Sequence, residues 1–182
     1  MEEKKAVEVC RHFHLGDAAR KLLRPELTAE QYLELLIQNK QYADAVRVLA
    51  YALPKRQAIV WANECARQFS ETNPSDKFST ALEAVNKWLV EPNDENRRAA
   101  MKAAECAEFG TPPGSAALAV FFSSGSLAPP DAPVIPPQEY LTPNAVIGSI
   151  LMAALLKEPE KAEDKYQVFL AAGQKIAAGN CR

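Results

Sequence analysis

The chain has 182 residues, and its 21 basic and 23 acidic side chains leave a net charge of −2. This length is enough to bury roughly 70% of the unfolded surface in one ordinary domain, so no disulfide or metal is needed for stability. The even charge balance excludes the basic surface of a nucleic-acid-binding protein and the polybasic face of a membrane-bound one. We therefore expect a protein or small-molecule partner.

Cysteine usage and the lack of a long apolar run favour a cytoplasmic protein. The cysteines are far apart in sequence and lack the C-x2-C spacing of a zinc site, which predicts free thiols: Cys10, Cys65, Cys106 and Cys181. Cys65 and Cys106 fall on alanine-rich helical stripes, where we expect them to be buried in a reducing compartment. We expect no secretion signal at the N-terminus and no membrane insertion, because no run reaches ~18 apolar residues.

The N-terminal part predicts an ordered entry segment with a short helix, up to about Arg24, followed by two longer helices. A short helix is expected to stop before Pro25. Thr28 is placed to cap the next helix, and Gln31 completes a capping-box pattern. That helix breaks near residues 39–40, and the short connection favours an antiparallel helix over residues 42–53.

Two helical patterns meet at Pro54, and we expect the core to be organised around this corner. Proline is disfavoured inside a helix but tolerated in its first turn, so one helix ends near Leu53 and another begins at Pro54. The second pattern continues to about Phe69. Trp61 lies on its apolar face and is predicted to anchor a helix-on-helix core.

Five further helices are expected after the turn-rich residues 70–76. The first stops before Pro92, and Asn93 or Asp94 caps an alanine-rich helix with Gly110 just beyond its end. The remaining patterns start at Thr111–Pro112, at Thr142–Pro143 and near Pro159, and the last ends at Gly179–Asn180.

Residues 123–141 contain five prolines and no helical period, which predicts extended or polyproline-like backbone. One interpretation is a docking motif, since Pro130, Pro133 and Pro136 have P-x-x-P spacing. The other, which we favour, is a rigid crossover strap packed across the helices. Three apolar side chains would fasten such a strap: Val134, Ile135 and Tyr140.

No segment shows a convincing strand pattern, so the fold class is all-α. We expect residues 1–182 to form a single helical domain of about seven or eight helices, with a possible lobe boundary within residues 123–141. A closed bundle and a layered array of helix pairs are both compatible with the sequence.

The only cluster of metal-capable side chains is Cys10, His12 and His14. In an extended segment the three would face the same side, whereas in a helix they would scatter around the axis. A fourth ligand is missing, and no glycine-rich phosphate loop is present. The sequence therefore predicts no metal, no cofactor and no catalytic residue, with these three as weak metal candidates.

Lys55 and Arg56 are cations at the start of a helix, where the helix dipole disfavours positive charge. Their position therefore needs an explanation. They could contact an acidic partner, or Arg56 could pair with a carboxylate of a neighbouring helix. We favour the second explanation, with Asp44 or Glu83 as the carboxylate.

The corner segment ALPKRQAIVWANECAR resembles a bacterial family of helical domains with no assigned activity and an ALP-basic-Arg-x-Ala-x-x-Trp-Ala signature. The similarity extends to Asp44–Ala45, to Glu95–Glu105, to Thr111–Pro130 and to Leu141–Ile150. Members often have a second tryptophan where this chain has Val60. The resemblance implies an accessory or adaptor protein encoded beside secretion-system genes, type VI in particular, and carries over no catalytic residue.

The sequence thus favours a non-enzymatic, intracellular helical module that binds another protein. The missing catalytic cluster, the balanced charge and the stiff proline segment support this interpretation. The alternative is a small-molecule-binding protein or small enzyme, with a pocket between helices near Trp61 and under the proline segment.

Overall fold

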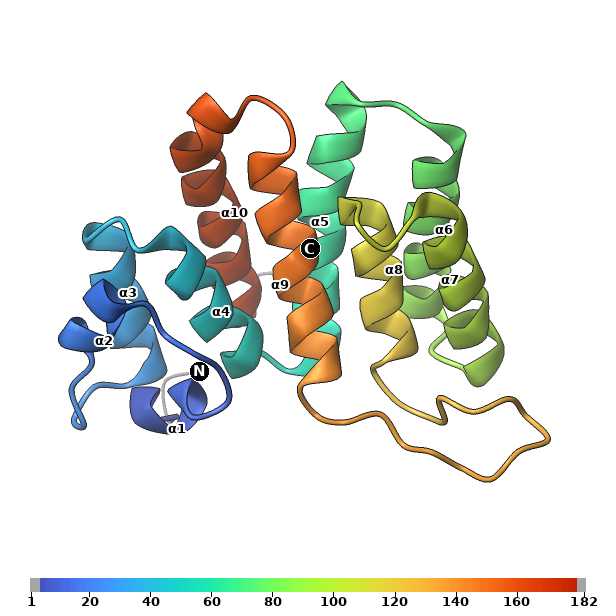
Figure 1. The fold of residues 1–182 in the computed structure, drawn as a ribbon, viewed down its shortest axis with the longest axis horizontal. Coiled ribbons are helices and arrows are strands. Elements are labelled where there is room, and N and C mark those ends of the chain that lie inside the picture. Colours follow the sequence, from blue (N-terminus) through green and yellow to red (C-terminus); the bar gives the residue numbers. More distant parts are fainter. Residues whose placement is uncertain (1–3, 180–182) are drawn as a thin grey trace.

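The computed structural model describes residues 4–179, and its regular structure is helical (Figure 1). In chain order the elements are α1 (Ala6–Cys10), α2 (Asp17–Leu22), α3 (Ala29–Gln38), α4 (Tyr42–Ala52), α5 (Lys55–Thr72), α6 (Asp76–Val90), α7 (Asp94–Ala107), α8 (Pro112–Phe121), α9 (Leu141–Leu155), the 3₁₀ turn η1 (Pro159–Lys161) and α10 (Ala162–Ala177). Within these residues there is no strand, only an isolated bridge between Lys5 and Thr28. The all-α prediction is confirmed, and the short helix α1 is an addition to it. None of the helices in residues 4–179 has the length and apolar character needed to cross a membrane.

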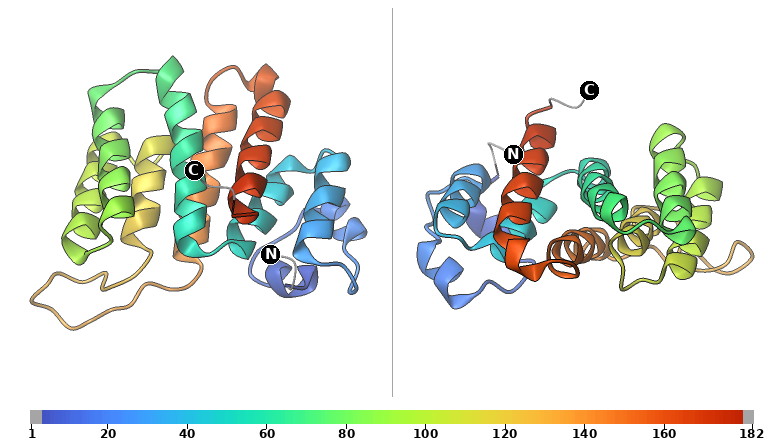
Figure 2. Two further views of the ribbon diagram at one scale, coloured as in Figure 1. Left: turned by 180° about the vertical axis from the view of Figure 1, so that it is seen from behind. Right: turned by 90° about the horizontal axis from the view of Figure 1, so that it is seen from above.

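The helices lie side by side along the long axis of the molecule, from α1–α3 at one end to α6 and α7 at the other (Figure 1). Seen from above, they form an open row and not a closed ring (Figure 2). Helix α9 is central, because it packs against α4, α5, α8 and α10. The architecture is therefore a layered array of helices.

Three helix starts follow the capping chemistry expected from the sequence. Thr28 and Gln31 form a complete capping box at α3, Asn93 accepts a hydrogen bond from the Asn96 amide at α7, and Thr111 accepts one from Gly114 at α8. Each side chain satisfies an amide that lacks a partner within its helix. These confirmed caps fix where the chain turns between helices.

Two helix boundaries differ from expectation. Helix α7 ends at Ala107, earlier than a cap at Gly110 would place it, and Glu108 takes a positive φ of 69°. The Thr111 hydroxyl donates to the carbonyls of Ala107 and Glu108, which closes the helix at that point. Helix α9 begins at Leu141, just ahead of the expected Thr142–Pro143 start, because the Asn144 amide donates the first helical hydrogen bond to the Tyr140 carbonyl.

The Pro54 corner is confirmed and carries the centre of the core. Leu53 is extended after α4, and Pro54 immediately precedes α5. Trp61 is fully buried, and its indole Nε1 donates to the Phe169 carbonyl at 2.7 Å. A Cβ at Gly173 would lie 2.7 Å from the Trp61 ring, so the absence of a side chain there lets α10 approach the indole. Trp61 therefore joins α5 to α10, as predicted for a core anchor.

Residues 123–140, called here the projecting loop, do not pack across the helices. The loop extends from the end of the molecule where α8 and α9 are connected (Figures 1 and 2). The side chains expected to fasten it are exposed: Val134 by 76%, Ile135 by 56% and Tyr140 by 50%. The strap prediction is wrong because these apolar residues have neither helical nor strand periodicity, and so do not gather on one buried face.

The cysteines were only partly placed correctly. Cys10 and Cys65 are buried free thiols, and Cys106 is also free but exposed. The expectation that Cys106 lies on a buried stripe is wrong, because its neighbours Ala103, Ala104 and Ala107 form the packed face of α7. Cys181 lies outside the described residues.

Candidate functional site

The weak metal candidates are not brought together by the fold. Cys10 is buried, and burial, followed by the charge of Asp44, raises the pKa of its thiol to about 12. The His12 ring stacks on Tyr51 with 5.8 Å between centroids, while His14 lies 3.4 Å from the Arg20 guanidinium. Across the described residues no group of three or more His, Cys, Asp or Glu side chains could hold a metal ion.

Arg56 has a structural partner, but not the one expected. Its guanidinium Nη2 donates to the Leu89 carbonyl at 2.6 Å, and no bond to Asp44 or Glu83 is formed by this side chain within residues 4–179. Leu89 lies in the last turn of α6, where carbonyls lack helical partners and the dipole favours a cation. Arg56 therefore ties the start of α5 to the end of α6.

Lys55 links the Pro54 corner to both ends of the projecting loop. Its ammonium Nζ lies 3.1 Å from Glu139 Oε2 and 3.5 Å from the Ser123 carbonyl. The Glu139 side chain is 90% exposed, and exposed ion pairs of this kind contribute only ~0.2–1 kcal/mol. The contact positions the end of the loop but leaves the Glu139 carboxylate easy to displace.

The base of the projecting loop is held by Arg97, which is 1% exposed. Its guanidinium donates to the Phe121 carbonyl at 2.8 Å and to the Ser126 carbonyl at 2.9 Å. Gly125 has a φ of 69°, and a Cβ there would lie 2.8 Å from Arg97 Nε. Both the backbone conformation and the available space therefore require glycine next to this arginine.

Asp94 and Arg98 complete the anchor at the loop base. Asp94 Oδ1 accepts from Arg97 at 2.6 Å and Oδ2 accepts from Arg98 at 2.7 Å. These hydrogen bonds, with Arg98 contributing most and Arg97 next, lower the pKa of the Asp94 carboxyl. Arg98 also donates to the Ala128 carbonyl at 3.1 Å. The first residues of the loop are thus fixed to the N-terminal end of α7.

The outer part of the projecting loop is organised by its own backbone. The Leu127 amide donates to the Ile135 carbonyl, and the Ala132 amide donates to the Pro129 carbonyl. The turn closed by the second bond contains Pro130, so Pro130 and Pro133 do not lie on one continuous extended segment. The three prolines of the predicted docking motif are all exposed: Pro130, Pro133 and Pro136. Pro133 and Pro136 follow the turn, in residues 133–138, which are neither helix nor strand and are called here the arm.

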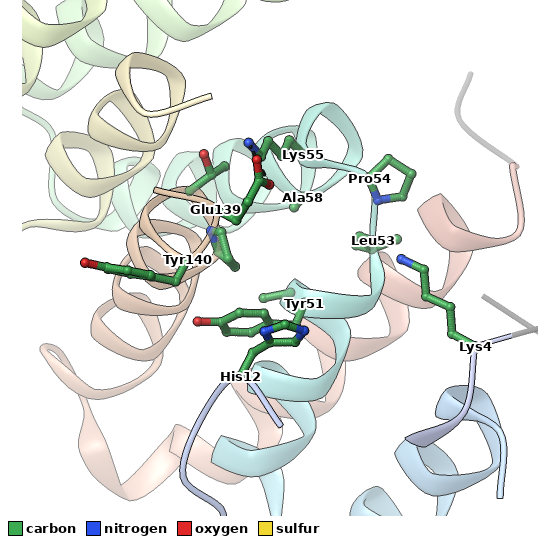
Figure 3. A pocket seen from close by; sticks show the side chains of 12 residues that line it. Lys4, His12, Tyr51, Leu53, Pro54, Lys55, Ala58, Glu139 and Tyr140 are labelled. Atoms are coloured by element: carbon green, nitrogen blue, oxygen red, sulfur yellow. Dashed lines mark ion pairs between the residues drawn. The ribbon is translucent and has the colours of Figure 1, made fainter. Parts of the chain in front are cut away.

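A cavity of about 370 Å³ lies at the Pro54 corner, under the last residues of the projecting loop (Figure 3). We call it the corner cavity; its lining comes from the N-terminal segment, the end of α4, and the starts of α5 and α9. The residues are Lys4, His12, Ala50, Tyr51, Leu53, Pro54, Lys55, Ala58, Glu139, Tyr140, Thr142 and Pro143. Trp61 is fully buried and is not among them, so the pocket lies nearer the corner than expected.

The corner cavity contains both satisfied and unsatisfied polar groups. The Lys4 ammonium donates to the Ala52 carbonyl at 3.0 Å, and the Tyr51 hydroxyl donates to Asn144 Oδ1 at 3.0 Å. The hydroxyl of Thr142, a residue only 1% exposed, has no hydrogen-bond partner within the described part of the chain. A buried hydroxyl without a partner is unusual in a native protein.

Comparison with known proteins gives a match to a family. A family model described as "Family of unknown function (DUF6931)" matches residues 32–177, from α3 to the end of α10. No curated protein and no solved structure matches the chain. The family match covers more than half of the chain and includes both the projecting loop and the Pro54 corner.

Proposed function

Because the chain belongs to the family of unknown function DUF6931, whose description supplies no activity, we propose from the structure that it is a non-enzymatic protein-interaction module. The docking element is the projecting loop. The observation that supports this proposal is a loop with a fixed base and an exposed apolar arm: Val134 is 76% and Ile135 is 56% exposed.

The construction of the loop favours binding over a purely connecting role. Arg97 and Arg98 hold the carbonyls of Ser126 and Ala128, so the loop base is already ordered before a partner arrives. Prolines restrict the remaining arm, which lowers the conformational entropy lost on binding. The exposed pair Val134 and Ile135 then offers apolar area that only a partner would bury.

We propose an extended-segment mode of recognition for the arm beyond the turn. Pro133 and Pro136 have P-x-x-P spacing in a segment that is neither helix nor strand, and such spacing suits a partner groove lined by aromatic side chains. The setting we propose is the bacterial cytoplasm, as an accessory of a secretion system of type VI. That setting is supported by the resemblance of the corner signature, residues 52–62, to proteins encoded beside such genes.

The test is affinity capture from the native host with three forms of the full chain. Val134→Ser/Ile135→Ser removes the apolar pair from the arm, and Val90→Ser is the matched control, since Val90 is 86% exposed at the end of α6. We expect a protein captured by the wild type and by Val90→Ser to be lost with the double variant. Capture of the same proteins by all three forms would refute the loop as the docking element.

A second variant tests the mode of recognition. Pro133→Ala/Pro136→Ala keeps the apolar pair but removes the two prolines of the arm. Extended-segment docking predicts that the captured protein binds this variant at least about tenfold more weakly. The two proline rings can no longer contact the partner groove, and the arm loses the conformational restriction that the prolines impose. Unchanged affinity would show that the apolar pair is recognised without the prolines.

A further inference from the structure

We propose that the corner cavity binds a small organic acid, a carboxylate or phosphate monoester on a flat ring. Its acid group would take the place now held by the Glu139 carboxylate. This inference goes beyond the proposed protein-interaction function and does not depend on it. It rests on the charges, the helix starts, the unpaired hydroxyl and the flat walls that meet in this cavity.

The charged side chains of the corner cavity favour an anion. Lys4 and Lys55 contribute positive charge, and among the described lining residues Glu139 alone is acidic. The 3.1 Å contact between Lys55 and Glu139 shows that a carboxylate already fits beside this ammonium. Because Glu139 is 90% exposed, the chain can release it to solvent at little cost when another acid group binds.

Two helices point their N-terminal ends at the same cavity. Helix α5 starts at Lys55 and helix α9 at Leu141, next to the lining residues Tyr140 and Thr142. Neither start has a side-chain cap. The positive end of the helix dipole favours a negative group at both starts. At α5 the first-turn amides can also donate to it, whereas at α9 the Leu141 amide already bonds to the Gln138 carbonyl and Pro143 has no amide.

Thr142 brings a buried hydroxyl to the lining of the cavity. It belongs to the lining, is 1% exposed, and its hydroxyl has no partner within residues 4–179. A buried hydroxyl left unpaired destabilises the protein, whereas an acceptor oxygen from a ligand would satisfy it. An acid group bound between Thr142 and Lys55 would provide that oxygen.

The remaining walls of the cavity are flat or apolar. The rings of His12 and Tyr51 are stacked at 5.8 Å with only 4° between their planes, and Figure 3 shows them beside Tyr140. Leu53 and Pro143 add apolar surface. A volume of about 370 Å³ falls in the range of small-molecule sites, ~300–1,000 Å³. These walls favour a ring as the body of the ligand.

The experiment is calorimetric titration of the full chain with phenyl phosphate and benzoate, and with phenol as the uncharged control. Binding of the acids without binding of phenol is expected. Lys55→Met should weaken binding at least about tenfold, because a charge-assisted hydrogen bond is lost. The matched control is Lys102→Met, an exposed lysine on α7, which should bind like the wild type.

Two further variants distinguish the proposed site from non-specific attraction. Glu139→Gln removes the competing carboxylate and should tighten phenyl phosphate binding about 2–5-fold. Thr142→Val should weaken binding while raising the Tm of the ligand-free protein by about 2–4 °C, since the unpaired hydroxyl is gone. Phenol binding as tight as phenyl phosphate, or affinity that neither Glu139→Gln nor Thr142→Val changes, would overturn the proposal.

Discussion

The core around Trp61 and the arm of the projecting loop both contain apolar residues, but these are buried in the core and exposed in the arm. Trp61 is fully buried, while Val134 is 76% exposed. In α5 the apolar residues recur at helical spacing on a backbone that satisfies its own hydrogen bonds, so one stripe can be buried. In the loop, prolines remove amide donors and no spacing gathers the side chains. Apolar character therefore leads to burial only when the backbone presents a periodic face.

The two regions are also held in different ways. Trp61 is surrounded by side chains and backbone from several helices, with Gly173 leaving room for its ring. The loop is held only at its base, by polar bonds from Arg97 and Arg98 to backbone carbonyls. The contribution of the core to stability should therefore depend on side-chain volume, and that of the loop base on charge and hydrogen bonding.

The largest expected effect is that of Trp61→Ala. Emptying a fully buried site of this size should lower the free energy of unfolding by about 3–5 kcal/mol, and the Phe169 carbonyl loses its 2.7 Å donor as well. Urea denaturation measures the change, with Val134→Ala in the loop as the matched control, expected within ~0.5 kcal/mol of wild type. Equal urea midpoints for Trp61→Ala and Val134→Ala would show that the core does not depend more strongly on side-chain volume than the loop does.

Arg97→Met comes next, and tests whether polar bonds hold the loop base. The substitution keeps an apolar stem but leaves the carbonyls of Phe121 and Ser126 without their donor. A loss of about 1.5–3 kcal/mol is expected from urea denaturation, as for hydrogen bonds from a charged donor. The control is Arg67→Met on the exposed face of α5. If Arg97→Met were as stable as Arg67→Met, the anchor would not contribute to stability.

Features that arise from local chemistry were predictable from the sequence. The capping box of Thr28 and the proline corner at Pro54 depend on residues close together in the chain, and both are confirmed. The helical stripes correctly placed Trp61 in the core, because their period is the period of the helix itself. The five-residue helix α1 was missed because it is too short to show a period.

Features that depend on distant contacts were not predictable in the same way. Arg56 donates to a backbone carbonyl of α6. Every residue has such a carbonyl, so the positions of acidic side chains in the sequence could not identify this partner. The role of Arg97 and Arg98 was missed too, although Asp94 three and four residues earlier is a recognisable signal for an ion-paired helix start. The corner cavity combines four separate parts of the chain, which no spacing in the sequence reveals.

Gly173→Ala should have an intermediate effect and tests the packing of the first region. The new Cβ would lie 2.6 Å from Leu49 Cδ2 and 2.7 Å from the Trp61 ring, so atoms must shift. Overpacking outweighs the gain in helix propensity, and we expect a net loss of about 0.5–2 kcal/mol. Thermal unfolding measures the change in stability. The control is Gly110→Ala, because nothing lies within 4 Å of a Cβ at that position. A stabilised Gly173→Ala would contradict the close contact.

A smaller effect is expected from pH, through Asp94 at the loop base. Its hydrogen bonds with Arg98 and Arg97 lower its folded-state pKa below the unfolded value. Asp94 therefore stabilises the fold above the unfolded pKa, near 4, and this contribution is lost as the pH falls through the folded pKa. Asp94→Asn should be less stable than wild type at pH 6, with the difference shrinking toward pH 2. Asp131→Asn, a substitution at the exposed loop tip, is the matched control.

The smallest effect is expected when the outer part of the projecting loop is lengthened. Four Gly/Ser residues inserted after Asp131 add to a loop whose tip is exposed, while α8 and α9 remain joined by the bond from Ser115 to the Ala145 carbonyl. Loop-closure entropy grows only slowly with length, so the cost is about 0.2 kcal/mol. The same insertion after Asn63, inside α5, would add about one helical turn and move every later side chain of that helix ~6 Å along the axis, away from its present contacts, and should prevent folding. Urea denaturation measures both, and a loss above about 1 kcal/mol for the loop insertion would mean that its tip packs against the helices after all.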